Sequence, residues 1–338
     1  MRTKNLRLLL NWLWVYSKRN KNKGFTLIEL LVALIIAFLI ISVLLYLVVD
    51  LLQADAKESA RSETQQEMQM ALDYIARELR EAVYVYDGNC MKTTAQGSAG
   101  NANYCPGLLN YIPTFTNQTP ILAFWKAETV TDNDMPNCTG VSTSKQQECQ
   151  DLQVKRRTYT LVVYLQSTAN SSNTWSGKSR ITRYALRKYK TLSSFTQSEG
   201  YVDPSVENST TFQTWPVDPK TGTNLQSQSP LSSNSPDVLV DFVDSPTATV
   251  TVPACDSTKV PTPKSTSTTA SSNSFFACIS SVVPTTTTVV TTPSGINQDV
   301  VLYLRGNANG KPSVTNDSFR PALQTQVLIR GVINKTPQ

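Results

Sequence analysis

The side chains that could do chemistry in this 338-residue chain are restricted in kind, because the sequence contains no histidine. Without histidine, a Ser-His-Asp or Cys-His nucleophile and a histidine-ligated metal site are excluded. The chain also lacks both glycine-rich patterns that cradle phosphates, G-x-x-x-x-G-K and G-x-G-x-x-G. We therefore expect no catalytic centre, no cofactor and no metal, and a structural or binding protein rather than an enzyme.

The chain also contains six cysteines, which can bind metals or form disulfides. None forms a C-x-x-C pair, so the spacing of a zinc site or a thioredoxin-like redox site is missing. Outside the cytoplasm, an even number of cysteines favours disulfides. Pairing of sequence neighbours would close three loops, but six cysteines allow fifteen connectivities, so the pairing stays open. The candidate disulfide cysteines are Cys90, Cys105, Cys138, Cys149, Cys255 and Cys278.

One carboxylate, Glu29, lies at the edge of a long apolar run. Residues 30–49 contain no charge and one serine. At about 1.5 Å per residue, a helix over this run would span roughly 30 Å, the thickness of a bilayer core. Seven basic residues and no acid occur in residues 1–24, so the positive-inside rule predicts a cytoplasmic N-terminus. An ionised Glu29 is costly at the membrane and normally needs a partner.

The stretch K-G-F-T-L-I-E at residues 23–29 resembles the prepilin signal of type IV pilins and type II secretion pseudopilins. The resemblance implies that a prepilin peptidase cuts after Gly24, so that residues 1–24 are a leader, and then methylates the new N-terminal residue, Phe25. It also implies that Glu29 neutralises the N-terminal amine of a neighbouring subunit during assembly, a role that agrees with the high cost of an unpaired carboxylate in lipid. The alternative is an ordinary signal anchor with a chance match.

The organisation of the rest of the chain follows from its periodicity. Residues 25–87 contain neither Gly nor Pro, so we expect one long helix that Gly88 closes. Residues 25–50 would form the transmembrane and assembly half. Residues 51–87 would form an amphipathic half, because apolar residues recur there at three- and four-residue steps.

Beyond the helix, residues 88–338 are expected to form an extracytoplasmic β-rich domain. Strand-like runs occur at residues 121–126, 158–166, 180–190, 237–243, 299–305 and 322–330. Ser- and Thr-rich inserts near 256–298, particularly 256–274 and 284–293, are typical of loops. The expected fold is therefore α+β and pilin-like, with the long helix packed on an antiparallel β-sheet that carries long loop inserts.

Charge is unevenly distributed along the chain beyond residue 49. Residues 152–198 hold nine basic residues and no acid, whereas residues 50–87 hold nine acids against four bases. The basic segment could be a solvated strand face, could dock on the acidic helix of a neighbouring subunit, or could hold a polyanion such as DNA or an acidic polysaccharide. We favour docking, with Arg183 and Arg187 facing acids of another subunit's helix. Those acids would be Glu63, Glu67, Glu78 and Glu81. The candidate basic surface consists of Lys155, Arg156, Arg157, Arg180, Arg183, Arg187 and Lys188.

The helix end at residues 71–82 narrows the resemblance to PilW-type minor pilins, and pseudopilins of polysaccharide secretion share its features. The expected function is a minor pilin or pseudopilin of a filament for pilus assembly, motility, adhesion or polymer secretion. The alternative is a tip adhesin or polyanion-binding protein on the same scaffold.

The resemblance also implies partners and a location. The partners would be other pilins or pseudopilins through the N-terminal helix, the prepilin peptidase, an inner-membrane assembly platform and, in the alternative, a polyanion. The protein would first lie in the inner membrane, with a cytoplasmic N-terminus and a periplasmic C-terminal domain, and then in a filament at the cell surface.

Overall fold

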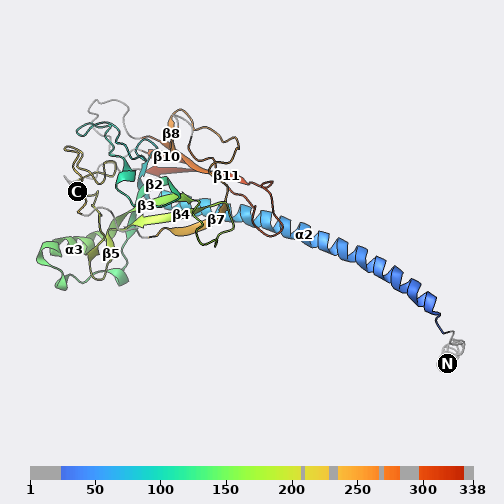
Figure 1. Cartoon of the computed structure of the whole chain (residues 1–338). Helices are drawn as coiled ribbons and strands as arrows, with labels where there is room; N and C mark the ends of the chain where they lie inside the picture. Colours follow the sequence, from blue (N-terminus) through green and yellow to red (C-terminus); the bar gives the residue numbers. More distant parts are fainter. Residues whose placement is uncertain (1–23, 207–209, 228–234, 266–269, 282–296, 331–338) are drawn as a thin grey trace, which may run out of the picture. The chain divides into compact units, whose positions relative to one another are not determined.

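The computed structural model divides into two units, residues 1–56 and residues 57–338. Helix α2 (Leu27–Arg80) contributes to both units, and all the described strands belong to the second (Figure 1). The residues that the structure describes are 24–206, 210–227, 235–265, 270–281 and 297–330.

Helix α2 packs on the rest of the second unit through one face. Within residues 57–80 its buried side chains recur at three- and four-residue steps, among them Met68, Ile75 and Leu79. Side chains with this spacing lie on the same side of a helix, so they form an apolar stripe that can be covered.

The helix ends at Arg80, so the prediction of a helix that continues to residue 87 was wrong. The next segment, A-V-Y-V-Y, forms strand β1 (Ala82–Tyr86). Valine and tyrosine favour strands, and pairing with β2 gives the backbone of this segment its hydrogen-bond partners. The absence of Gly and Pro therefore permitted a longer helix but did not require one.

The first sheet contains five antiparallel strands in the order β1-β2-β3-β4-β7. Its other members are β2 (Gln118–Thr129), β3 (Arg157–Ser167), β4 (Ser179–Leu186) and β7 (Asp237–Val243). The predicted runs at 121–126, 158–166 and 237–243 lie in these strands. The run at 180–190 is interrupted after Leu186, because β5 (Tyr189–Thr191) pairs instead with β6 (Thr196–Gln197) in a separate small sheet.

A second sheet has the order β11-β10-β9-β8, where the prediction had one sheet. Its strands are β8 (Lys259–Thr262), β9 (Phe275–Ser280), β10 (Asn297–Arg305) and β11 (Ala322–Arg330). The runs at 299–305 and 322–330 were predicted as strands, whereas β8 and β9 fall inside the inserts predicted as loops. The 284–293 stretch lies outside the described residues.

The short helices lie in the connections between strands. They are η1 (Leu108–Asn110), η2 (Asp132–Asp134), η3 (Cys138–Gly140) and α3 (Thr143–Lys155). Helix α3 was not predicted, because its residues are almost entirely polar and show no apolar periodicity.

The main core combines α2 with both sheets. Side chains of α2 such as Ile75 pack with Phe124 and Val162 of the first sheet and with Phe275 and Leu302 of the second. The structure thus confirms the predicted fold class, an α+β protein in which one long N-terminal helix packs on antiparallel β-structure.

A side chain links the two sheets. Gln298 at the start of β10 accepts a hydrogen bond from the Val85 backbone N–H at 2.9 Å and donates one to the Val85 carbonyl at 2.8 Å. Its amide therefore occupies the place of a neighbouring peptide group along β1, whose backbone would otherwise be buried without partners.

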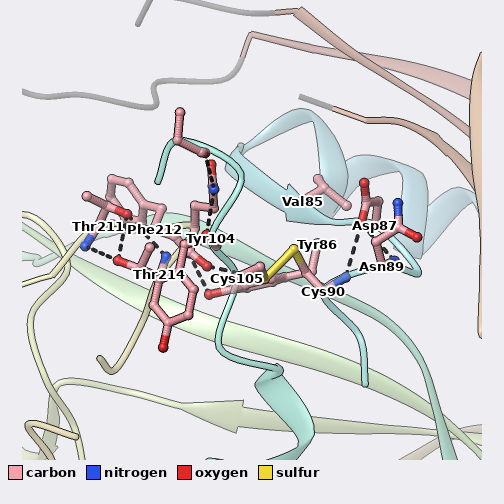
Figure 2. The surroundings of a disulfide bond; sticks show 12 residues. Val85, Tyr86, Asp87, Asn89, Cys90, Tyr104, Cys105, Thr211, Phe212 and Thr214 are labelled. Carbon is pink, nitrogen blue, oxygen red and sulfur yellow. Dashed lines mark hydrogen bonds between the residues drawn. A yellow bond between two sulfur atoms is a disulfide. The ribbon is translucent and has the colours of Figure 1, made fainter. Parts of the chain in front are cut away.

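Three disulfides stabilise the connections. They join Cys90 to Cys105, Cys138 to Cys149, and Cys255 to Cys278, which is the nearest-neighbour pairing. Figure 2 shows the first of them beside Asp87, whose carboxylate accepts hydrogen bonds from the backbone N–H of Asn89 at 2.9 Å and of Cys90 at 3.2 Å. This loop covers the face of the first sheet opposite α2, where Trp125 and Trp215 are buried.

We expect the turn after β1 to tolerate no side chain at Gly88. A Cβ there would lie 1.8 Å from the Pro261 carbonyl oxygen, a backbone atom that cannot rotate away. Gly88→Ala should therefore lower the free energy of unfolding by roughly 1–3 kcal/mol. Gly140→Ala is the matched control, because a Cβ at Gly140 would meet nothing within 4 Å. Denaturation of the two variants in parallel tests this expectation, and equal stabilities would contradict it.

Candidate functional site

The predicted processing site lies immediately before α2. Gly24, Phe25 and Thr26 precede the first helical residue, and the Phe25 side chain is 78% exposed. A Cβ at Gly24 would meet nothing within 4 Å, so the fold itself does not require glycine there. The peptide bond between Gly24 and Phe25 is thus outside regular structure, in an exposed segment that a peptidase could bind.

Thr26 caps the start of the helix. Its carbonyl accepts hydrogen bonds from the N–H groups of Glu29 at 3.1 Å and Leu30 at 3.2 Å, and its hydroxyl accepts from Glu29 N–H at 3.4 Å. Thr26 and Glu29 have the T-x-x-E spacing of a capping box, and an acid in the first turn interacts favourably with the helix dipole. The cap formed by Thr26 was not predicted, although the T-x-x-E spacing is visible in the sequence.

The helix that follows presents a continuous apolar surface. Large side chains over residues 27–49 are exposed, and Leu27 is 84% exposed. Within the described part of the chain, α2 is the one helix whose length and composition would allow it to cross a membrane. An exposed apolar surface of this length is unstable in water, so it needs lipid or other helices as a cover.

A cluster of polar and charged side chains surrounds Glu78 near the end of α2. The Glu78 side chain is buried. Neighbouring strands β2, β3 and β4 each supply one donor to it: Lys126, Tyr164 and Arg183. Arg183 makes a two-pronged contact, with Nε 2.9 Å and Nη2 2.8 Å from the two carboxylate oxygens, and Lys126 Nζ lies 2.8 Å away. This cluster, which we call the Glu78 clamp, fixes the end of α2 to the first sheet.

The clamp keeps Glu78 ionised. Burial by itself would raise the pKa of Glu78, but hydrogen bonds from Arg183, Lys126 and Tyr164 outweigh it and lower the pKa from 4.5 to about 2. Because the folded-state pKa lies below the unfolded value, the clamp stabilises the fold fully above about pH 4.5. Its contribution is lost as the pH falls from there towards 2.

Three of the residues predicted to form an exposed basic surface are instead buried or paired within the chain. Arg183 binds Glu78 of its own chain, not of a neighbouring subunit, and its side chain is 14% exposed. Arg180 is buried, and its guanidinium lies 4.8 Å from the centre of the Trp175 ring. Lys188 is enclosed by Glu148 at 2.8 Å and Asp203 at 2.7 Å. The prediction that Arg180, Arg183 and Lys188 form an exposed surface was therefore wrong.

The other predicted basic residues are exposed. Arg187 contacts Glu128 at 3.2 Å. At the end of α3, Arg156 lies 2.7 Å from Asp132, and Lys155 lies 3.9 Å from Asp151. Arg157 begins β3 next to them and is also exposed. Exposed ion pairs of this kind contribute little to stability, so these cations remain available to a partner.

The acids predicted to receive a neighbour's basic segment also have partners within the chain. Glu63 and Glu67 contact Lys311 Nζ at 3.1 and 3.0 Å, and Glu81 contacts Lys126 at 3.5 Å. The helix flank is thus partly neutralised by its own domain.

In the described ranges, no cluster of three or more His, Cys, Asp or Glu side chains is placed to hold a metal ion.

Comparison with known proteins identifies one region. A family model described as the prokaryotic N-terminal methylation motif matches residues 19–45. The match includes the exposed glycine–phenylalanine bond, the capped start of α2 and most of its apolar run. Comparisons with curated proteins and with solved structures found no match. The motif supports a type IV pilin-like or pseudopilin protein, structural rather than enzymatic, that prepilin peptidase processes and that is anchored in a membrane before filament assembly.

Proposed function

We propose that the protein is a minor pilin or pseudopilin of the PilW type, a structural subunit of a type IV pilus-like or type II secretion-like filament. The observation that carries the proposal is the matched methylation motif on a capped, exposed apolar helix that leads into a disulfide-stabilised β-rich domain. A surface helix of this kind can exchange lipid for other helices without refolding the domain.

In this proposal the peptidase removes residues 1–24 and methylates Phe25. Glu29 then meets the N-terminal amine of a neighbouring subunit, which neutralises both charges inside an apolar helix bundle. Other pilins or pseudopilins pack on the apolar half of α2, and an inner-membrane assembly platform adds the subunit to the filament. The N-terminus starts in the cytoplasm and the domain in the periplasm, and the assembled subunit reaches the cell surface.

The alternative role, a tip adhesin or polyanion-binding protein, has less support. Three of its seven candidate cations, Arg180, Arg183 and Lys188, are buried or enclosed by acids of the same chain. The remaining exposed cations form a small group at the end of α3 and one isolated arginine, a weak footprint for a polyanion.

Glu29→Gln should leave processing intact but reduce recovery of the protein in sheared filaments by roughly a factor of 10 to 100. Glutamine can still serve in a capping box, so the substitution removes the charge while the start of the helix is retained. Immunoblots of membrane and filament fractions give the ratio. The matched control is Glu58→Gln, which removes an exposed carboxylate from the same helix. Wild-type recovery of the Glu29 variant would contradict charge pairing.

A further inference from the structure

An open groove of about 530 Å³ lies between α2 and strand β7 in the second unit. Its apolar walls include Met70 and Tyr74 of α2 and Val238 of β7, which are 57%, 40% and 41% exposed. Strand β7 is at the end of its sheet, next to β4, and its last residue, Val243, also forms a bridge with Gly306. Large apolar side chains gathered at an open sheet edge are typical of a protein-binding surface rather than of a solvated one.

The charged residues that line this groove are both acids, Glu67 and Asp241. Glu67 shares the cation Lys311 with Glu63, so one cation serves two carboxylates there. Oxygen Oδ1 of Asp241 is buried without a hydrogen-bond partner in the structure. Trp175 completes the wall, and its ring already holds one guanidinium, that of Arg180, at 4.8 Å. The groove therefore suits an apolar side chain that is accompanied by cations.

A surface of the opposite character projects from the end of α3. Val154 is 83% exposed, and Lys155, Arg156 and Arg157 follow it directly. We call residues 154–157 the α3 corner. Arg156 adopts a left-handed conformation, with φ of 51°, and its N–H bonds to the Leu152 carbonyl at 2.8 Å, so the helix stops at the corner.

The α3 corner is held in place by the rest of its domain. The Cys138–Cys149 disulfide ties α3 to η3, and Leu152 is buried in the small core below. Lys188 also binds Glu148 of α3 at 2.8 Å. Because the corner is already fixed, docking it loses little conformational entropy.

We infer that the α3 corner of one copy of this chain docks into the α2–β7 groove of a second copy. Val154 would cover Met70 and Val238, and the three cations would face the acidic groove. The α3 corner and β7 lie well apart in Figure 1, so one copy cannot make this contact with itself. A contact between two different surfaces is heterologous, so it can repeat from copy to copy along a filament. The inference rests on the proposed filament role only in bringing copies side by side.

Cysteine cross-linking tests this contact in the full-length protein. One tagged copy carries Val154→Cys and a differently tagged copy carries Val238→Cys, and both are expressed in the same cells. A short thiol cross-linker should join the two different copies and give no dimer when either variant is expressed alone. In the control, the second copy carries Leu328→Cys instead of Val238→Cys. Leu328 is an exposed position on β11 outside both surfaces, so this copy should give no cross-link.

A charge test addresses the same contact in a second way. Adding Lys155→Glu and Arg156→Glu to the Val154→Cys copy should lower the cross-link yield about tenfold. Lys145→Glu, on the first turn of α3, is the matched control and should leave the yield unchanged.

The yields are measured in membrane and filament fractions, and peptide mapping verifies the 154–238 link. No cross-link in either fraction, or equal cross-linking in the single-variant controls, would overturn the inference. Failure of the proposed function would appear separately, as absence of processing or of the protein from filaments.

Discussion

Replacing Glu78 with alanine is expected to lower the free energy of unfolding by about 3–5 kcal/mol, the usual effect of breaking a buried ion pair from one side. The substitution would leave Arg183, Lys126 and the Tyr164 hydroxyl without their shared acceptor. The side chains of Glu78, Lys126 and Arg183 are 9%, 11% and 14% exposed, so water cannot replace the lost carboxylate fully. The clamp joins α2 to three strands, so the loss should affect the whole domain.

Glu81→Ala is the matched control for this prediction. Glu81 also contacts Lys126, at 3.5 Å, but its side chain is 57% exposed. Removal of such an exposed partner should change the free energy of unfolding by less than about 1 kcal/mol. Denaturant titration in detergent, followed by fluorescence of the buried Trp125 and Trp215, measures both variants. Similar losses for the two would show that the clamp is not a buried ionic contact.

Replacing Gly24 with leucine should block removal of the leader, with Gly24→Ala cleaved more slowly than wild type. A peptidase that must place this bond in its active site loses roughly a factor of 100 or more when a side chain displaces it. The substitution should not disturb the fold, because a Cβ at Gly24 would contact nothing within 4 Å. Any change can therefore be assigned to processing.

Gly140→Leu provides the control, since Gly140 also has nothing within 4 Å of a Cβ. It should be processed like wild type. The ratio of precursor to mature protein after pulse labelling gives the rate, and normal cleavage of Gly24→Leu would contradict the assignment of the cut.

Local patterns explain what the sequence could predict. The apolar run, the glycine–phenylalanine–acid spacing and strands such as β7 and β11 depend on neighbouring residues, so they could be found without a structure. The end of α2 was harder, because a segment that can continue a helix becomes a strand once β2 pairs with it. Strands β8 and β9 were hidden because they adjoin Ser- and Thr-rich sequence, and their stability comes from pairing with each other and with β10.

The prediction of an exposed basic surface was wrong for a related reason. Glu78 and Arg183 are 105 residues apart, and nothing in the local sequence shows that the helix brings an acid to that strand. The strand that carries Arg183 was predicted correctly. Whether the Arg183 side chain is exposed or buried, however, depends on which element covers that face of the sheet. The exposed cations at the end of α3 were identified, while their fixed position depends on a helix that apolar periodicity does not reveal.

The N-terminus of the mature protein shows whether the chain is cleaved after Gly24 and methylated at Phe25, as proposed. Intact-mass analysis and N-terminal fragmentation are made on protein from cells with an active prepilin peptidase, with a peptidase-deficient strain as control. We expect a chain that begins at N-methylated Phe25 in the first strain and an uncleaved leader in the second. An uncleaved or unmethylated N-terminus in the presence of the active peptidase would contradict the assignment.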